Sequence, residues 1–189
     1  MSRHKEFNPA DALEQAMLVF WDHGFEGSST AELSTRMGIG KRSMYDTFGD
    51  KRQLYVAALR RYIDSTDAAR DHAVSVATSL NEALSALLAP PPGNDAHPRG
   101  CFATAAAAAT PADDAEIGAI LDGHMARGRA RIAAQICRFT ATPKSRAVEI
   151  AHFAQDAATG LRVRARAGLT QPGDVTRLVT VVNTLATAA

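Results

Sequence analysis

The sequence predicts an all-α fold, and three observations support that prediction. Apolar residues recur three and four positions apart in nearly every patterned segment, as they do on one face of a helix. No segment alternates apolar and polar residues in the manner of a strand, and no repeat of fixed period is present. Proline and glycine fall at the ends of the periodic segments, where they begin or stop helices. The chain of 189 residues is long enough to bury a core.

The first third of the chain predicts three short helices and the start of a long one. The first covers residues 9–22 and is stopped by Gly24. A second helix is opened by Ser29, whose side chain caps it while Glu32 reaches back, and it ends at Gly38. A glycine turn followed by apolar residues four positions apart predicts a third helix over 41–48. A long helix follows, opened by the capping box Asp50-Lys51-Arg52-Gln53.

The rest of the chain predicts alanine-rich helices separated by proline-bearing breaks. The clearest loop lies over residues 90–100, where three prolines and a glycine follow one another. Thr110-Pro111 and Thr142-Pro143 each provide a start for a further helix. The expected helices cover about 76–89, a stretch from near Cys101, about 110–139, about 144–168 and about 173–188. The last has one apolar stripe, formed by Val175, Leu178, Val179, Val182, Leu185 and Ala186.

Composition divides the chain into two parts. Eight of the eleven aromatic residues lie within residues 1–62. That segment holds six alanines, whereas the rest of the chain holds 32. Two different ways of filling a core indicate two modules, with a join near residues 50–65.

Several classes of protein are excluded by the same counts. No stretch approaches the ~20 apolar residues of a membrane span, and no apolar run typical of a signal peptide follows the first residues. Two cysteines provide no disulfide framework, so we expect reduced thiols and a cytoplasmic protein. A net charge of +1 excludes a uniformly basic nucleic-acid coat but leaves room for a local basic face.

Residues 29–48 carry the functional signal. A short helix, a glycine-bearing turn and a second short helix form a helix-turn-helix, which lays its second helix in the major groove of DNA. The exposed start of that helix must offer donors to base edges, and Arg or Lys can donate to guanine O6 and N7. Met44 and Phe48 face inward, four residues apart. The candidate DNA-binding residues are Thr30, Lys41, Arg42, Ser43, Tyr45, Thr47 and Lys51.

The segment from Gly27 to Lys51 resembles the DNA-binding domain of the TetR (tetracycline-repressor) family. The Ser29-x-x-Glu32 cap and the glycine turn are commonplace taken alone, but the full spacing is specific. The resemblance covers about residues 9–62 and depends on matched residues at fixed spacing, namely Thr30, Gly38-Ile39, Met44-Tyr45, Phe48 and Lys51.

The resemblance implies a homodimeric transcriptional regulator, usually a repressor, that responds to a small-molecule effector and binds a pseudo-palindromic double-stranded operator. It implies a DNA-binding domain over 1–52 and an effector-binding and dimerisation domain over 53–189, with no cofactor. By position, Thr30, Tyr45 and Lys51 match residues that contact phosphates in the family. Lys41, Arg42 and Ser43 occupy its variable base-contacting positions.

Three residues depart from the family pattern. Gly40 stands where a polar capping residue is more usual, and Ala31 replaces a residue that is polar in some members. Asp46 would repel phosphate if it faced the DNA backbone, so we expect it to face cytosine N4 or solvent.

Arg3, His4 and Lys5 form either a disordered tail, which we favour, or an arm for the minor groove.

The resemblance places the effector pocket among helices between about residues 76 and 160. Core packing is the favoured interpretation for each single candidate, since apolar side chains fill cores more often than they contact ligands. Cys101, beside Arg99, is either a small buried residue, which we favour, or a thiol that senses oxidants. The candidate effector contacts are Cys101, Phe102, Thr104, Met125, Phe139, His152 and Phe153.

The resemblance also implies that the last two helices, about 144–168 and 173–188, form a four-helix bundle with a second copy. The alternative is that the apolar stripe packs only within its own subunit, and both can hold. In a dimer, two recognition helices about 34–36 Å apart would enter successive major grooves. Arg162, Arg164 and Arg166 are interpreted as a solvated rim.

The alternative function is a helical small-molecule-binding protein or a di-iron-type bundle enzyme with an incidental helix-turn-helix. Glu149 and His152 have the Glu-x-x-His spacing of such iron sites, with Asp156 one turn further on. The site requires a second Glu-x-x-His and two further glutamates on facing helices, and the chain offers no second copy of the motif. We therefore predict no catalytic and no metal-binding residues.

Overall fold

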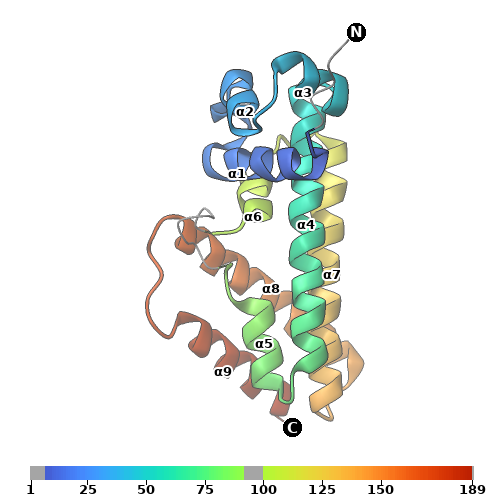
Figure 1. Cartoon of the computed structure of the whole chain (residues 1–189). Coiled ribbons are helices and arrows are strands. Elements are labelled where there is room, and N and C mark those ends of the chain that lie inside the picture. The colour runs from blue at the N-terminus through green and yellow to red at the C-terminus, as the bar shows by residue number, and fades with distance from the viewer. Residues whose placement is uncertain (1–6, 92–99, 189) are drawn as a thin grey trace. The chain divides into compact units, whose positions relative to one another are not determined.

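The computed structural model describes residues 7–91 and 100–188, and every regular element among them is helical (Figure 1). The all-α prediction is confirmed. The helices in chain order are α1 (Pro9–Gly27), α2 (Thr30–Arg36), α3 (Lys41–Phe48), α4 (Lys51–Val76), α5 (Leu80–Leu88), α6 (Phe102–Ala109), α7 (Ala115–Phe139), α8 (Lys144–Arg166) and α9 (Asp174–Thr187). Within the described ranges, no helix is long and apolar enough to cross a bilayer.

The chain forms two compact units, one ending at Asp64 and the other beginning at Ser65. We call them the N-terminal unit and the C-terminal unit. Helix α4 contributes its first half to one and its second half to the other. The division at residue 52 expected from the family concerns function rather than packing, and it stays a prediction.

The local signals of the N-terminal unit act largely as expected. The Asn8 side chain accepts from the Ala10 N–H at 2.9 Å at the start of α1. The helix passes the predicted stop at Gly24 through a kink, where that glycine has φ +72°, and ends at Gly27. Ser29 caps α2 by accepting from the Glu32 N–H at 3.1 Å.

The interior of the N-terminal unit is filled largely by aromatic side chains. Phe20 is fully buried, and its ring meets Tyr55 edge-on with 5.1 Å between centroids. Trp21 and Tyr62 form a second edge-on pair at 4.9 Å. Burial raises the pKa of the Tyr55 hydroxyl to about 12, so that side chain stays neutral in the core. These few large side chains hold α1 against the first half of α4.

One boundary in the C-terminal unit differs from the prediction. A single helix was expected over 76–89, but α4 runs to Val76 and α5 begins only at Leu80. The break is a capping box that the alanine-rich pattern concealed. Ser79 accepts from the Glu82 N–H at 3.2 Å, and the Glu82 carboxylate accepts from the Thr78 N–H at 2.8 Å.

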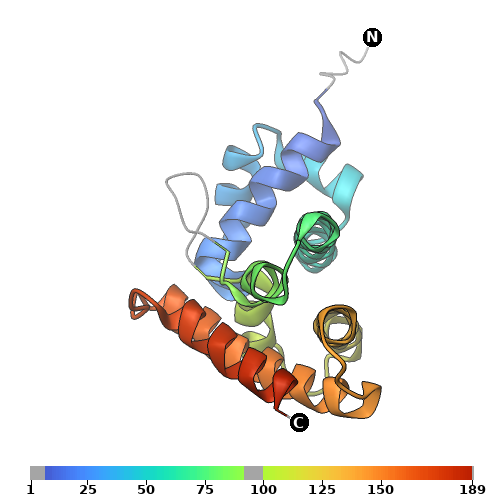
Figure 2. The same ribbon diagram turned by 90° about the horizontal axis from the view of Figure 1, so that it is seen from below.

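The core of the C-terminal unit is formed mainly by α5, α7, α8 and α9, which pack against one another (Figure 2). Helix α8 contributes small side chains, and α9 contributes Val179, Val182 and Ala186 from its predicted stripe. Leu185 of that stripe remains 37% exposed. Thr142 donates to the Ala186 carbonyl and so fastens the end of α9 near the start of α8. Small residues on α8 allow the helices to approach closely.

Candidate nucleic-acid interface

Two glycines fix the ends of the turn and of the recognition helix. Gly38 has φ +68° in the turn after α2, where the Ile39 N–H donates to the Ser34 carbonyl at 3.1 Å. Gly49 follows α3 with φ +76°, and a Cβ there would lie 1.6 Å from Gln53 Oε1. The Gln53 side chain lies this close to Gly49 because it accepts from the Asp50 N–H at 3.0 Å, while the Asp50 side chain accepts from the Gln53 N–H at 2.8 Å. A side chain at Gly49 would displace this reciprocal cap of α4.

Helix α3 buries one side and exposes the other. Met44 is 1% exposed and anchors the helix in the core of the N-terminal unit. Lys41, Arg42 and Ser43 are all exposed on its first turn. Gly40 precedes them and provides no side-chain cap, so the first N–H groups of α3 remain available to an anion. The exposed start of α3 therefore offers backbone, ammonium, guanidinium and hydroxyl donors together.

The other predicted contact residues lie around α3. Tyr45 is 44% exposed and Thr47 is exposed on the same helix. Thr30 opens α2 and is half-buried. Lys51 opens α4, and its Nζ lies 4.4 Å from the centroid of the Phe25 ring, a contact that orients the ammonium. The sequence did not reveal that Phe25 contacts Lys51, because Phe25 follows Gly24, where the first helix was predicted to stop.

Two charged contacts restrain this surface. The Glu32 carboxylate was expected to return to the α2 cap, but it lies 2.9 Å from His23 Nδ1 instead and links α1 to α2. On α3, Asp46 Oδ2 lies 3.7 Å from Arg42 Nε, and both side chains are largely exposed. The negative charge of Asp46 weakens the positive potential around Arg42. Because the pair is exposed, the guanidinium can still change its orientation.

The predicted effector contacts differ in burial. Cys101, Phe102 and Thr104 are at most 6% exposed at the start of α6, whereas Met125 and Phe139 on α7 are half-buried. His152 and Phe153 lie on the exposed face of α8. Cys101 occupies the N-cap position of α6. Arg99, like Arg3, His4 and Lys5, lies outside the described residues.

The Glu-x-x-His segment of α8 faces away from the core. Glu149, His152 and Asp156 are all exposed. Among the residues that the structure describes, no three His, Cys, Asp or Glu side chains are grouped so as to hold a metal ion. Arg162 corrects the rim interpretation, since it is 3% exposed and donates to the Leu87 carbonyl at 3.0 Å.

Helix α3 buries Met44 and exposes a basic first turn, and it follows α2 and a glycine turn. This arrangement is that of a helix-turn-helix DNA-binding protein. Residues 12–58 match the family model for bacterial regulatory proteins of the tetR family. This segment therefore has the DNA-binding domain of that family, and the chain is similar to its transcriptional regulators.

Relatives and solved structures agree with this assignment. The chain is 38% identical over 84 residues to the HTH-type transcriptional regulator YezE of Bacillus subtilis, a match that spans 44% of this chain and 43% of YezE. It is 28% identical over 175 residues to the HTH-type transcriptional repressor ComR of Escherichia coli, covering 88% of this chain and 83% of ComR.

Among solved structures, a cysteine mutant of the TetR family regulator CifR, complexed with a 26-base-pair operator, superposes with a TM-score of 0.78. The two chains are 27% identical, and the match covers 98% of each. The likeness therefore extends through both units and is not confined to the helix-turn-helix.

Proposed function

We propose that the chain is a homodimeric repressor that leaves its operator when a small-molecule effector binds the C-terminal unit. The observation that carries the DNA-binding part is the exposed first turn of α3, with Met44 buried beneath it. Arg42 and Lys41 would contact base edges, and Ser43 would assist them. Thr30, Tyr45, Thr47 and Lys51 would contact phosphates and so fix the register of the helix. Such a protein would act in the cytoplasm.

A gel-shift titration against the DNA upstream of the protein's own gene tests this role. We expect sequence-selective binding that weakens steeply with salt, because phosphate contacts release counterions. Random duplex DNA of equal length is the control. No selectivity at low salt, together with stoichiometric bound iron, would instead support the bundle-enzyme alternative.

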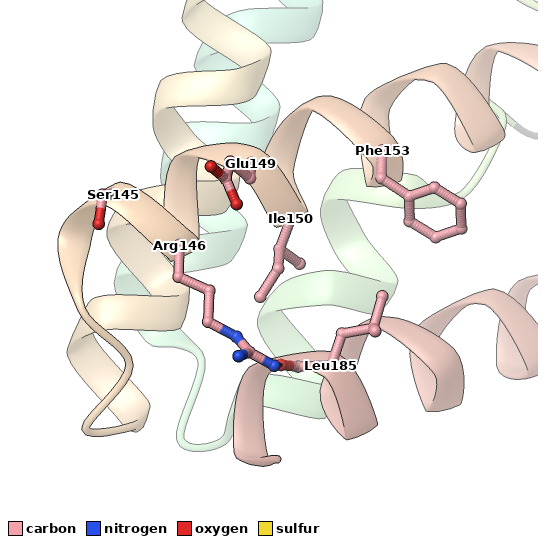
Figure 3. A pocket seen from close by; sticks show the side chains of 6 residues that line it. All are labelled: Ser145, Arg146, Glu149, Ile150, Phe153 and Leu185. Carbon is pink, nitrogen blue, oxygen red and sulfur yellow. The ribbon is translucent and has the colours of Figure 1, made fainter. Parts of the chain in front are cut away.

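The homodimer is supported by exposed apolar side chains on α8 and α9. Val148 is 42% exposed, Phe153 49% and Val181 46%. Phe153 and the 37% exposed Leu185 line one groove, and contiguous exposed apolar side chains mark interaction surfaces. A groove of about 380 Å³ lies where α8 meets α9, and the Arg146 guanidinium crosses it to the Leu185 carbonyl at 3.2 Å (Figure 3). It is lined by Ser145, Arg146, Glu149, Ile150, Phe153 and Leu185. A second copy would cover this face with its own α8 and α9.

Sedimentation velocity tests the dimer. Phe153→Glu should produce monomers, because it places a charge in an apolar contact. Val76→Glu is the matched control, since Val76 is 63% exposed and belongs to α4 rather than to α8 or α9. A Phe153→Glu protein that sediments as a dimer would remove this face from the interface.

The effector would act by changing the relative populations of two conformations of the dimer. The effector would favour dimers whose recognition helices no longer match successive major grooves. Repression is the direction suggested by ComR, a transcriptional repressor whose match spans both units. A reporter fused to the operator should be more active in a strain that lacks the gene. Lower activity in that strain would make the protein an activator.

A further inference from the structure

Helix α1 is kinked at Gly24, and the kink redirects the chain shortly before α2. Gly24 has φ +72° and ψ −180°, a conformation that is nearly exclusive to glycine. A Cβ there would meet no other part of the described fold within 4 Å, so the backbone conformation, and not crowding, requires the glycine. Two hydrogen bonds hold the kink, since the Ser28 hydroxyl donates to the Gly24 carbonyl at 2.6 Å and the Ser28 N–H donates to the Phe25 carbonyl at 3.4 Å. The kink therefore fixes the backbone from which the Phe25 side chain projects.

The Phe25 ring is held by two buried aromatic neighbours. Its centroid lies 6.4 Å from that of the Phe20 ring, with 19° between the ring planes. It meets the Tyr55 ring at 5.2 Å and 68°, which is an edge-on arrangement. Phe20 is fully buried and Tyr55 is 4% exposed, whereas Phe25 is only half-buried. The ring is thus fixed by the core of the N-terminal unit while part of it stays at the surface.

The Phe25 ring contacts the Lys51 ammonium. Lys51 Nζ lies 4.4 Å from the ring centroid, within the ~6 Å at which an aromatic face attracts a cation. A carboxylate partner would offset the positive charge, as Asp46 does for Arg42 on α3. An aromatic face orients the ammonium but leaves its charge and its three N–H donors available. This contact therefore suits a lysine that must still bind an anion.

The backbone of Lys51 is fixed as well. Lys51 is the first residue of α4 and lies within the reciprocal cap between Asp50 and Gln53. Leu54, in the first turn of the same helix, is fully buried and anchors it. Lysine has a flexible four-carbon stem, and ordering such a stem on binding costs affinity. Both ends of this stem are restrained in the structure, the Cα by the cap and the ammonium by the ring.

We propose that Phe25 is a positioning residue for DNA binding, whose ring holds the Lys51 ammonium ready for a backbone phosphate without touching the DNA itself. Gly24 provides the backbone conformation, Phe20 and Tyr55 fix the ring, and the ring restrains the lysine. Part of the affinity for DNA of any sequence thus originates in an aromatic residue that lies outside α2 and α3. The inference rests on the proposed function, in which Lys51 contacts a phosphate.

A double-mutant cycle on the full-length protein tests this role. Wild type, Phe25→Leu, Lys51→Ala and the double variant are titrated at low salt against random-sequence duplex DNA, since a phosphate contact does not depend on base sequence. Phe25→Leu should weaken binding about three- to tenfold. In the Lys51→Ala background the same change should alter affinity less than about twofold, because no ammonium is left to position. Phe25→Tyr keeps an aromatic face and should bind within about twofold of wild type.

The cycle also separates positioning from a loss of stability. Phe25→Leu removes ring contacts in the core, so urea midpoints are measured for every variant and DNA is titrated under conditions in which each is folded. A change that acted only through the fold would weaken DNA binding equally in both backgrounds. Equal losses in the wild-type and Lys51→Ala backgrounds would overturn the proposal. So would a Phe25→Leu protein that binds as wild type does, or a Phe25→Tyr protein as weak as Phe25→Leu.

The same titrations, repeated across a salt series and with the DNA upstream of the gene, distinguish this inference from the proposed function. A Lys51→Ala protein with weaker binding and a smaller salt slope, but no coupling to Phe25, would uphold the phosphate contact and overturn the role of Phe25. Unchanged affinity and salt slope in Lys51→Ala would overturn the phosphate contact itself. Coupling between the two residues in a wild-type protein that does not prefer the upstream DNA would uphold the role of Phe25 and overturn sequence-selective repression.

Discussion

The N-terminal unit fills its interior with rings, whereas the C-terminal unit fills its interior with small side chains and encloses charges. Phe20 is fully buried between Phe25 and Tyr55. In the other unit, Ala154 and Ala158 are also fully buried, yet Arg70, His124 and Arg162 share that interior. Large rigid rings leave few alternative packings, which suits a unit that must present α3 in one orientation. Small side chains around buried polar and charged groups suit a unit that changes when a ligand arrives.

Removing a ring from the N-terminal unit should have the largest effect. Phe20→Ala would leave a cavity beside two aromatic neighbours and lower the free energy of unfolding by about 3–5 kcal/mol. Urea denaturation measures this loss, and operator binding should disappear with it. Ala154→Gly in the C-terminal unit is the contrast, with an expected cost of about 1 kcal/mol. Equal costs would show that the two interiors do not differ in the way we describe.

Removing the shared carboxylate of the C-terminal unit should come next. Asp67→Asn removes the negative charge that Arg127 and Arg131 share and one of the two acceptor oxygens, and we expect a loss of about 2–3 kcal/mol in the free energy of unfolding. Asp71→Asn is the matched control, because its side chain is 60% exposed and its ion pair is screened by solvent. It should cost less than about 1 kcal/mol. A ranking in the opposite order would contradict the account of Asp67.

Acid should destabilise the C-terminal unit through His124. Burial depresses the pKa of this histidine from 6.5 to about 4, so the folded state binds a proton less readily than the unfolded chain does. Its contribution is therefore complete above pH 6.5 and is lost as the pH falls toward 4. Between pH 7.5 and pH 5 the loss should be about 2 kcal/mol. Urea midpoints at the two pH values measure it, and His124→Gln should remove that part of the difference. A His124→Gln protein with the same pH dependence as wild type would place the titrating group elsewhere.

The sequence was sufficient for features set by local signals. Helix α3 begins and ends as predicted because Gly40 and Gly49 delimit it and Met44 needs a core. The start of α5 was missed, since alanines continue through the break and hide the cap at Ser79. Local periodicity cannot distinguish a break of three residues from a continuous helix when both sides favour helix.

The buried charges could not be predicted from the sequence, because burial depends on which helices pack together. Arg162 stands in a run with Arg164 and Arg166 that has the pattern of a solvated face, yet Arg162 is enclosed. Asp67 and Arg131 are 64 residues apart in the chain and meet only in the folded unit. The family resemblance places a ligand domain here, but its chemistry depends on these contacts.

The most direct test of DNA recognition by α3 compares Arg42→Ala with Lys51→Ala on operator and random DNA across a salt series. Arg42→Ala should cost about 1–3 kcal/mol on the operator and little on random DNA, because it removes contacts to base edges. Lys51→Ala should weaken both duplexes alike and reduce the salt slope by about 1, because it removes a phosphate contact. Equal losses on both duplexes for both variants would contradict the assignment of α3 as the helix that distinguishes one DNA sequence from another.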